Sequence, residues 1–168
     1  DRMAPALTAL AELLRTRTMQ LLDLPEGESL LVEEVHDEPW WAFNYYQGDL
    51  RSRVVVNADT LTTPFDLVML AAHEAYPGHH TEHAVKEQLL IREGGRLEEA
   101  IQLVPTPQAV VSEGIAEVAE EVLLGDDADH VTAGYVRPLG IPYEPEVAAA
   151  VREAYADLIR ARGDRLFA

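Results

Sequence analysis

The residues best suited to chemistry lie in one short stretch, residues 73–83, which reads HEAYPGHHTEH. It holds four of the six histidines of the chain, together with two glutamates. Histidine is the side chain that most often binds metals in proteins. The chain has no cysteine, so histidine and carboxylate side chains would have to hold any metal. The stretch therefore predicts a metal site.

The spacing of the histidines decides which of them can share an ion. Residues i and i+4 of a regular helix lie about 40° apart around the axis, as in the HExxH signature of zinc proteases. Here Pro77 stands four residues after His73. On an unbroken helix His79 would lie about 120° away from His73. A two-residue bulge at Pro77 and Gly78 would return His79 to the position that i+4 normally fills.

We therefore predict that His73 and His79 bind a metal and that Glu74 is the base that activates a metal-bound water. The alternative is a surface helix that carries a few histidines and ends at Pro77 and Gly78. That alternative leaves three features unexplained, namely the helical turns before the break, the helix-forming sequence after it and the adjacent His-Glu pair. The metal site is the interpretation that accounts for all three.

A third ligand is needed, and a later helix expected over 107–124 offers glutamates on one face. By its pattern alone this is an ordinary solvated acidic face of an amphipathic helix. Two histidines and a glutamate form a known catalytic zinc set with one open position, which favours Glu113. Gly114 follows it and would let another backbone approach closely. The face carries Glu113, Glu117, Glu120 and Glu121, and the opposite face Val111, Ile115, Val118 and Val122.

Periodicity predicts the elements before the motif. Leucines at helical spacing indicate a helix over 3–23. Three runs rich in β-branched and aromatic residues indicate a small antiparallel sheet, whose aromatic side chains are expected to pack on it. The last of these strands could be an edge beside the metal, where an extended substrate would pair with its backbone. The runs are 30–35, 41–46 and 53–57, with a hairpin that turns at Gly48-Asp49.

The helix that carries the motif is expected to begin with Thr63 as its N-cap and Pro64 in its first turn. Its turns before His73 are apolar nearly all round, which is typical of a buried helix. After the bulge it is expected to resume to residue 91, and a short helix near 96–103 follows. A final helix over 147–159 is expected to close at Gly163.

Composition limits the class of protein. The length of 168 residues suits a single domain, and 48% hydrophobic and 26% charged residues are ordinary for a soluble globular protein. A net charge of −17 argues against nucleic acid and anionic membranes as partners. No apolar run has the length of a membrane span and no secretory signal is visible, which favours a cytoplasmic protein. The oligomeric state is left open.

HEAYPGHH, followed in the later helix by SEGIAEVAE, resembles the bacterial domain-of-unknown-function family 885. Its members carry HExxPGHxxQ and a downstream EGWxxYxE, and the family resembles the gluzincin class of zinc metallopeptidases. The resemblance implies one Zn²⁺ held by His73, His79 and Glu113, with Glu74 as general base. Glu120 matches the second glutamate of the family and could hydrogen-bond a ligating imidazole. Asn57 resembles an asparagine of the preceding strand that could hold substrate backbone.

The chain also departs from the family pattern. Glu82 stands where the family has Gln, Ile115 where it has Trp, and Val118 where it has Tyr. These departures affect the surroundings of the ligands and the shape of the pocket rather than the ligand set. Family chains are much longer, and the resemblance is best over residues 50–125. The chain is accordingly interpreted as a trimmed catalytic core or a reduced member.

These observations predict an α+β, mainly α-helical domain over residues 1–168, with gluzincin-like architecture and zinc-dependent hydrolysis of peptide bonds. One alternative keeps the metal and hydrolyses a non-peptide amide or ester. Another is a non-catalytic binding domain with a vestigial or structural metal, in which His80 or His83 closes the fourth position. Further candidates for contact with substrate or ligands are Glu117, Glu120, His80 and Asn57, and for the oxyanion, by residue type, Tyr135, Arg137 and His130.

Overall fold

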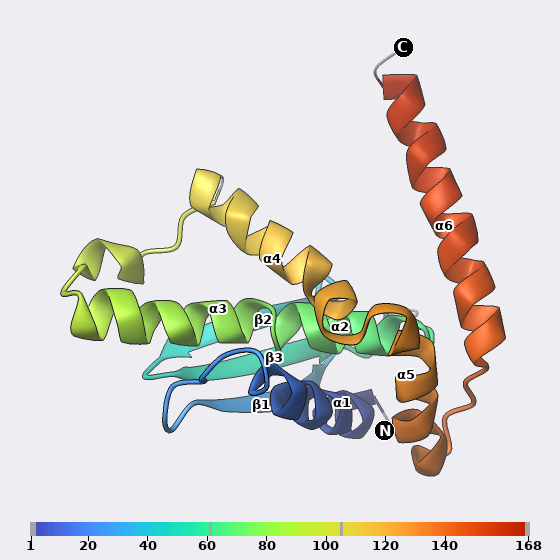
Figure 1. Ribbon diagram of the computed structural model, residues 1–168, viewed down its shortest axis with the longest axis horizontal. Coiled ribbons are helices and arrows are strands. Elements are labelled where there is room, and N and C mark those ends of the chain that lie inside the picture. The colour runs from blue at the N-terminus through green and yellow to red at the C-terminus, as the bar shows by residue number, and fades with distance from the viewer. Residues whose placement is uncertain (1–2, 61, 105, 167–168) are drawn as a thin grey trace.

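The computed structural model describes residues 3–60, 62–104 and 106–166, the stretch 157–166 by its backbone only. A small sheet lies against helices from the beginning and the middle of the chain (Figure 1). This confirms the predicted α+β, mainly α-helical fold. The first half comprises α1 (Met3–Thr18), β1 (Ser29–Val35), β2 (Ala42–Gly48), β3 (Arg51–Asn57) and α2 (Asp66–Glu74). The second comprises α3 (His79–Lys86), η1 (Glu87–Glu93), η2 (Leu97–Ala100), α4 (Pro107–Leu124), η3 (Gly125–Asp127), α5 (Ala128–Val136), η4 (Arg137–Leu139) and α6 (Pro145–Leu166).

The sheet has the order β1-β3-β2 and is mixed. Strands β2 and β3 form the predicted antiparallel hairpin, with its turn at Asp49-Leu50, one residue later than expected. Strand β1, however, pairs with β3 in parallel, so the prediction of a wholly antiparallel sheet was wrong. After β1 the chain crosses to the far edge before it enters β2, and β3 then returns between them. The two edges of the sheet are therefore β1 and β2, with β2 beside α2 and α3, and the prediction that placed β3 at an edge was also wrong.

The core forms where α2 packs between α1 and the sheet. Leu7, Leu10 and Leu14 of α1 meet the apolar turns of α2, and Val56 of β3 closes the cluster. Helix α1 ends at Thr18 instead of residue 23, and the N–H groups of Gln20 and Leu21 beyond it donate to carbonyls only three residues back. A buried α2 fixes the position of the residues that follow it.

The ends of three other helices differ from expectation. Asp66 accepts hydrogen bonds from the backbone N–H and hydroxyl of Thr63, so Thr63 is not a conventional N-cap and α2 begins at Asp66. Helix α3 continues as a π-helical segment to Glu93, and a short 3₁₀ turn follows over Leu97–Ala100. Helix α6 passes Gly163 and extends away from the rest of the molecule (Figure 1).

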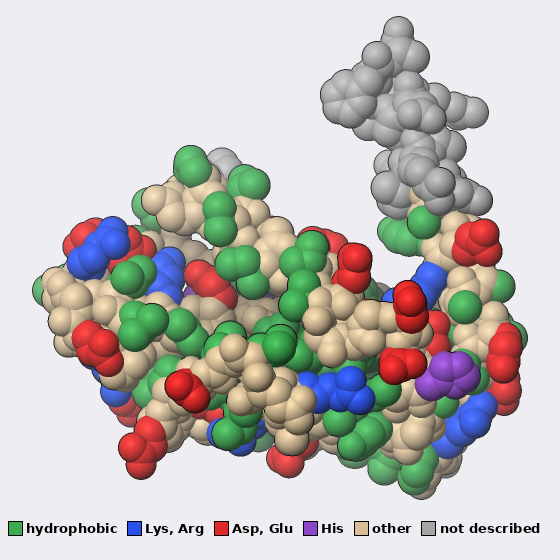
Figure 2. Space-filling view, viewed as in Figure 1, with side chains coloured by type: hydrophobic (Ala, Val, Ile, Leu, Met, Phe, Trp, Pro, Cys, Tyr) green, Lys and Arg blue, Asp and Glu red, His purple; other side chains and the backbone are tan. Residues whose placement is uncertain are grey.

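Helix α4 turns its larger apolar side chains to solvent. Its buried face consists mainly of small and polar residues, and hydrophobic side chains gather over its outer surface (Figure 2). The face expected to be apolar and buried is therefore exposed, whereas Glu113, Glu117 and Glu121 of the acidic face are exposed as a solvated face predicts. The small side chains explain the difference, because they let α4 pack closely against α2. The exposed residues are Val110, Val111, Ile115, Val118 and Val122.

Candidate metal centre

The joint between α2 and α3 is the predicted two-residue bulge. The N–H of Gly78 donates to the carbonyl of Ala72 at 3.0 Å, and that of Thr81 to the carbonyl of Ala75 at 3.3 Å. Each bond spans six residues where a regular helix spans four, so two residues are inserted. The insertion includes a cis Tyr76-Pro77 peptide bond. It brings the imidazoles of His73 and His79 together, with ring centroids 4.7 Å apart.

Only glycine fits at position 78. A Cβ there would lie 2.0 Å from the carbonyl oxygen of His73 and 2.4 Å from that of Ala72. The backbone of α3 therefore passes directly over the last turn of α2. This close approach sets the distance between the two histidines, and it depends on a single missing side chain.

Glu113 of α4 completes a group that could hold a metal. Its Oε2 lies 3.5 Å from Nε2 of His73, and its Oε1 lies 3.5 Å from Nε2 of His79. The three ligating atoms lie within 4.8 Å of one another. Ligands of a tetrahedral zinc with bonds of about 2.0–2.1 Å are about 3.4 Å apart, so the residues present fit Zn²⁺. Helix α4 comes this close because its contact face carries Ala116 and Ala119.

Gly114 does not have the role that was expected of it. No atom lies within 4 Å of a Cβ built there, so it does not admit a close backbone. The prediction of a close approach at Gly114 was wrong, because the close approach of the site is at Gly78.

The orientation of His79 is fixed from behind the site. Oγ of Ser112 donates to Oε2 of Glu82 at 3.1 Å and lies 3.3 Å from Nδ1 of His79. The hydroxyl oxygen can then accept a hydrogen bond from the Nδ1–H of His79. The lone pair of Nε2 is in that case directed toward Glu113. Burial, followed by the charge of His73, lowers the pKa of His79 and favours the neutral, metal-binding form. Ser112 precedes Glu113 in the motif, and that position was the available sequence signal for a role that we did not predict.

Glu74 lies beside these ligands and is buried. Burial, followed by the nearby charge of Glu113, raises the pKa of Glu74 to about 7, and the backbone N–H of Asn44 opposes the rise. The side-chain amide of Asn44 donates to the backbone carbonyl of Glu74 at 2.6 Å. Strand β2 is thereby attached to the end of α2, a contact that the sequence did not indicate.

His80 points away from the metal group and is fully buried. Its Nε2 lies 2.8 Å from Oε2 of Glu28, and its Nδ1 lies 2.8 Å from Oγ of Ser52. Tyr76 and Arg15 also donate to Glu28, at 2.5 and 2.6 Å. Burial alone would raise the pKa of Glu28, but these hydrogen bonds outweigh it and lower the pKa to about 2. His80 is thus a structural anchor and is not available as a ligand.

Two glutamates and an asparagine of the prediction lie outside the metal group. Glu120 forms an ion pair with Arg152 at 2.6 Å, so the prediction that it supports a ligating histidine was wrong. Being seven residues from Glu113, it lies two helical turns along α4 and reaches α6 instead. Glu117 lines a separate cavity, to which Glu120 and Arg152 also contribute. The side-chain amide of Asn57 donates to the backbone carbonyls of Glu38 and Trp40, so Asn57 stabilises the loop between β1 and β2.

The three residues predicted to stabilise the oxyanion lie on α5 or directly after its C-terminal end. His130 and Tyr135 are exposed on α5, and Arg137 hydrogen-bonds the backbone of Tyr143 and the carboxylate of Glu144. None of the three lines the metal cavity. Residue type alone could not reveal that α5 packs beyond α4, away from the histidines.

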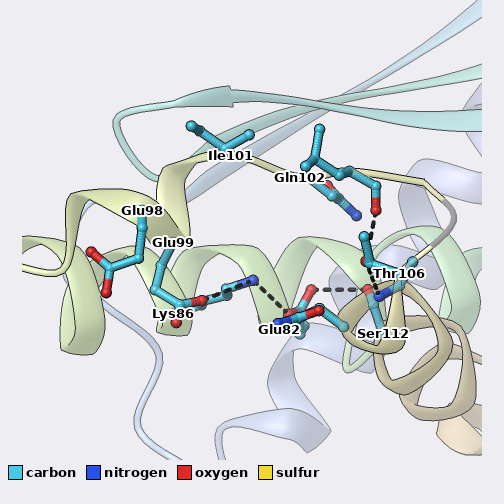
Figure 3. Close-up of a pocket in the computed structure, with 11 residues that line it drawn as sticks. Glu82, Lys86, Glu98, Glu99, Ile101, Gln102, Thr106 and Ser112 are labelled. Carbon is cyan, nitrogen blue, oxygen red and sulfur yellow. Dashed lines mark hydrogen bonds and ion pairs between the residues drawn. The ribbon is translucent and has the colours of Figure 1, made fainter.

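The metal group opens into a cavity of about 410 Å³. Its walls come from β2, the end of α2, α3, α4 and the segment before α4. Figure 3 shows that segment passing above α3, with Gln102 beside a neighbouring pocket that Glu82, Lys86 and Ser112 also line. The metal cavity is lined by Ala42, Phe43, Asn44, His73, Glu74, His79, His83, Gln102, Val104 and Glu113.

Comparison with protein-family models, with curated proteins and with solved structures found no match to this chain. The described helices include none with the length and apolar character needed to cross a bilayer. The geometry of the site is therefore the basis for assigning a function.

Proposed function

We propose that this chain is a zinc-dependent hydrolase that cleaves peptide bonds and is related to family 885. The observation that carries the proposal is the convergence of His73, His79 and Glu113 beside a separate buried carboxylate, Glu74, in one open cavity. Two histidines and a glutamate are a ligand set of catalytic zinc. A structural role for the group would leave Glu74 unexplained.

The fourth coordination position supports catalysis over a closed structural site. Structural zinc sites use four protein ligands, whereas catalytic sites keep one position open. Among the described residues, the group that could hold a metal contains three members. His80 is occupied by Glu28 and Ser52, and His83 is not part of the group.

The chain's own residues supply the proton chemistry. Zinc bound here would polarise a substrate carbonyl and lower the pKa of a water molecule. Glu74, a buried carboxylate beside the metal group, can accept a proton from that water and deliver it to the departing amine. Its burial excludes bulk water from this transfer. His79 is held in the neutral form with its Nε2 directed to the site.

The open edge of β2 favours a peptide over another amide or ester. The carbonyl of Trp41 accepts from the N–H of Asn57, which marks a hydrogen-bonded pair of the hairpin. In an antiparallel pair such residues alternate, so the backbone groups of Ala42 and Asn44 face outward, the N–H of Asn44 toward the carboxylate of Glu74. Both residues line the metal cavity. An extended peptide could therefore add to this edge with its scissile bond near the metal ligands.

The test combines metal content with turnover. Protein purified without chelator should hold about one zinc per chain, and His73→Ala should lose it. Glu74→Gln should keep the zinc but reduce cleavage of a peptide library by at least about a hundredfold. His130→Ala, at an exposed position far from the cavity, is the matched control. Full cleavage by Glu74→Gln, or no cleavage of any peptide by zinc-loaded wild type, would contradict the proposal.

A further inference from the structure

The metal cavity continues into a second cavity of about 360 Å³. The two share His83 and Gln102, and the second is lined by Tyr46, Gln47 and Gly48 of the same edge strand. Together they form a groove that follows β2 over its whole length. Such a groove suits an extended chain whose alternate side chains point to opposite sides.

The wall of this groove next to the metal ligands carries charges of one sign only. Its charged members are the carboxylates of Glu74 and Glu113, and no lysine or arginine lines the metal cavity. Its two large apolar members come from different elements. Phe43 of β2 is 49% exposed, and Val104 of the segment before α4 is 81% exposed.

Phe43 is held in place by other aromatic residues. Its ring centroid lies 4.8 Å from that of Tyr45 and 6.2 Å from that of Trp40. Phe43 is also a lining residue of the metal cavity, so the expectation that the aromatic residues pack the sheet is incomplete. An apolar wall that is already fixed loses little side-chain entropy when a ligand covers it.

We infer that the site selects peptides with an apolar side chain next to the cleaved bond, and that this side chain packs between Phe43 and Val104. The inference rests on the proposed function, because the metal ligands define which bond is cleaved. An acidic side chain would lie beside the carboxylates of Glu74 and Glu113, and no lysine or arginine lines the metal cavity to pair with it, so it is disfavoured. An apolar side chain in a half-open pocket should improve binding about tenfold.

Amino-acid hydroxamates test the subsite without turnover, because the hydroxamate binds zinc and leaves the side chain to probe the wall. We expect calorimetry on zinc-loaded protein to give leucine hydroxamate about tenfold tighter binding than glycine hydroxamate, and aspartate hydroxamate the weakest. Phe43→Ala and Val104→Ser should each remove most of the preference for leucine. Val110→Ser, at an exposed valine of α4 outside the cavity, should leave it unchanged.

Three results would overturn the inference: no binding of any hydroxamate, equal binding of the leucine and glycine compounds, or an equal loss in Val110→Ser. A peptide-cleavage assay on the same preparation separates this failure from that of the proposed function. Cleavage without preference for apolar residues would overturn the subsite alone. Hydroxamate preference without any cleavage would retain the subsite and refute peptide hydrolysis.

Discussion

Gly78→Ala should disrupt the metal site more than any other single methyl group added to the chain. The new Cβ would lie 2.0 Å from the carbonyl oxygen of His73, whereas ordinary contacts begin near 3.4 Å. Because the obstacle is backbone, α3 has to move by about 1 Å or more relative to α2. A zinc site tolerates deviations of about 0.2 Å in its bonds. We therefore expect the zinc affinity to fall by at least about a hundredfold.

The same variant should also lose stability. Overpacking of this kind costs about 1–3 kcal/mol, and a clash with two carbonyl groups belongs at the upper end. Gly114→Ala is the matched control, since its Cβ meets nothing within 4 Å and lies inside α4. Replacing a glycine within a helix by alanine should stabilise the protein by about 1 kcal/mol.

Both variants can be compared by urea unfolding of the metal-free protein and by zinc titration against a chelating dye. Gly78→Ala should lower both stability and zinc affinity, whereas Gly114→Ala should raise stability and leave zinc affinity near that of the wild type. Wild-type zinc affinity in a folded Gly78→Ala protein would refute the geometry of the joint. An equal loss of affinity in Gly114→Ala would show that α4, and not the joint, is the sensitive part.

Two further predictions concern the surroundings of the ligands. Ser112→Ala should weaken zinc binding about tenfold with little change in unfolding, because it removes the acceptor that orients His79; unchanged affinity in the dye assay would contradict this role. Glu28, whose folded pKa of about 2 lies below its ordinary 4.5, should contribute about 3 kcal/mol of stability above pH 4.5, and this is lost as the pH falls toward 2. Urea unfolding of Glu28→Gln should thus show less loss between pH 6 and pH 3 than the wild type, and parallel curves would refute it.

The parts of the site that could be predicted depend on local geometry. The distance in sequence between His73 and His79, with Pro77 and Gly78 between them, restricts the backbone to few solutions. The need for a third ligand indicated a glutamate of α4, and the resemblance to family 885 implied that it is Glu113. The α-helical boundaries followed from periodicity, with errors at Thr18 and Gly163 where hydrogen bonding rather than hydrophobic pattern determines the end.

The parts that could not be predicted depend on which surfaces meet. The parallel pairing of β1 with β3 is a non-local choice that the strand sequences do not encode individually. The valines of α4 look like a core face, yet the helix buries Ala116 and Ala119, because only small residues allow Glu113 to reach the histidines. Glu120 shares a face with Glu113 but reaches Arg152 of α6, a helix whose position the sequence did not indicate.

The first turn of α3 carries two adjacent histidines that point to different sides, His79 toward the cavity and His80 into the buried contacts with Glu28 and Ser52. The first turn of α3 is therefore fixed from the side opposite the metal before any metal is present. A site arranged in this way requires little reordering when an ion binds, so more of the interaction free energy remains for affinity. The anchor behind the joint is for this reason as much a part of the metal centre as the three ligands.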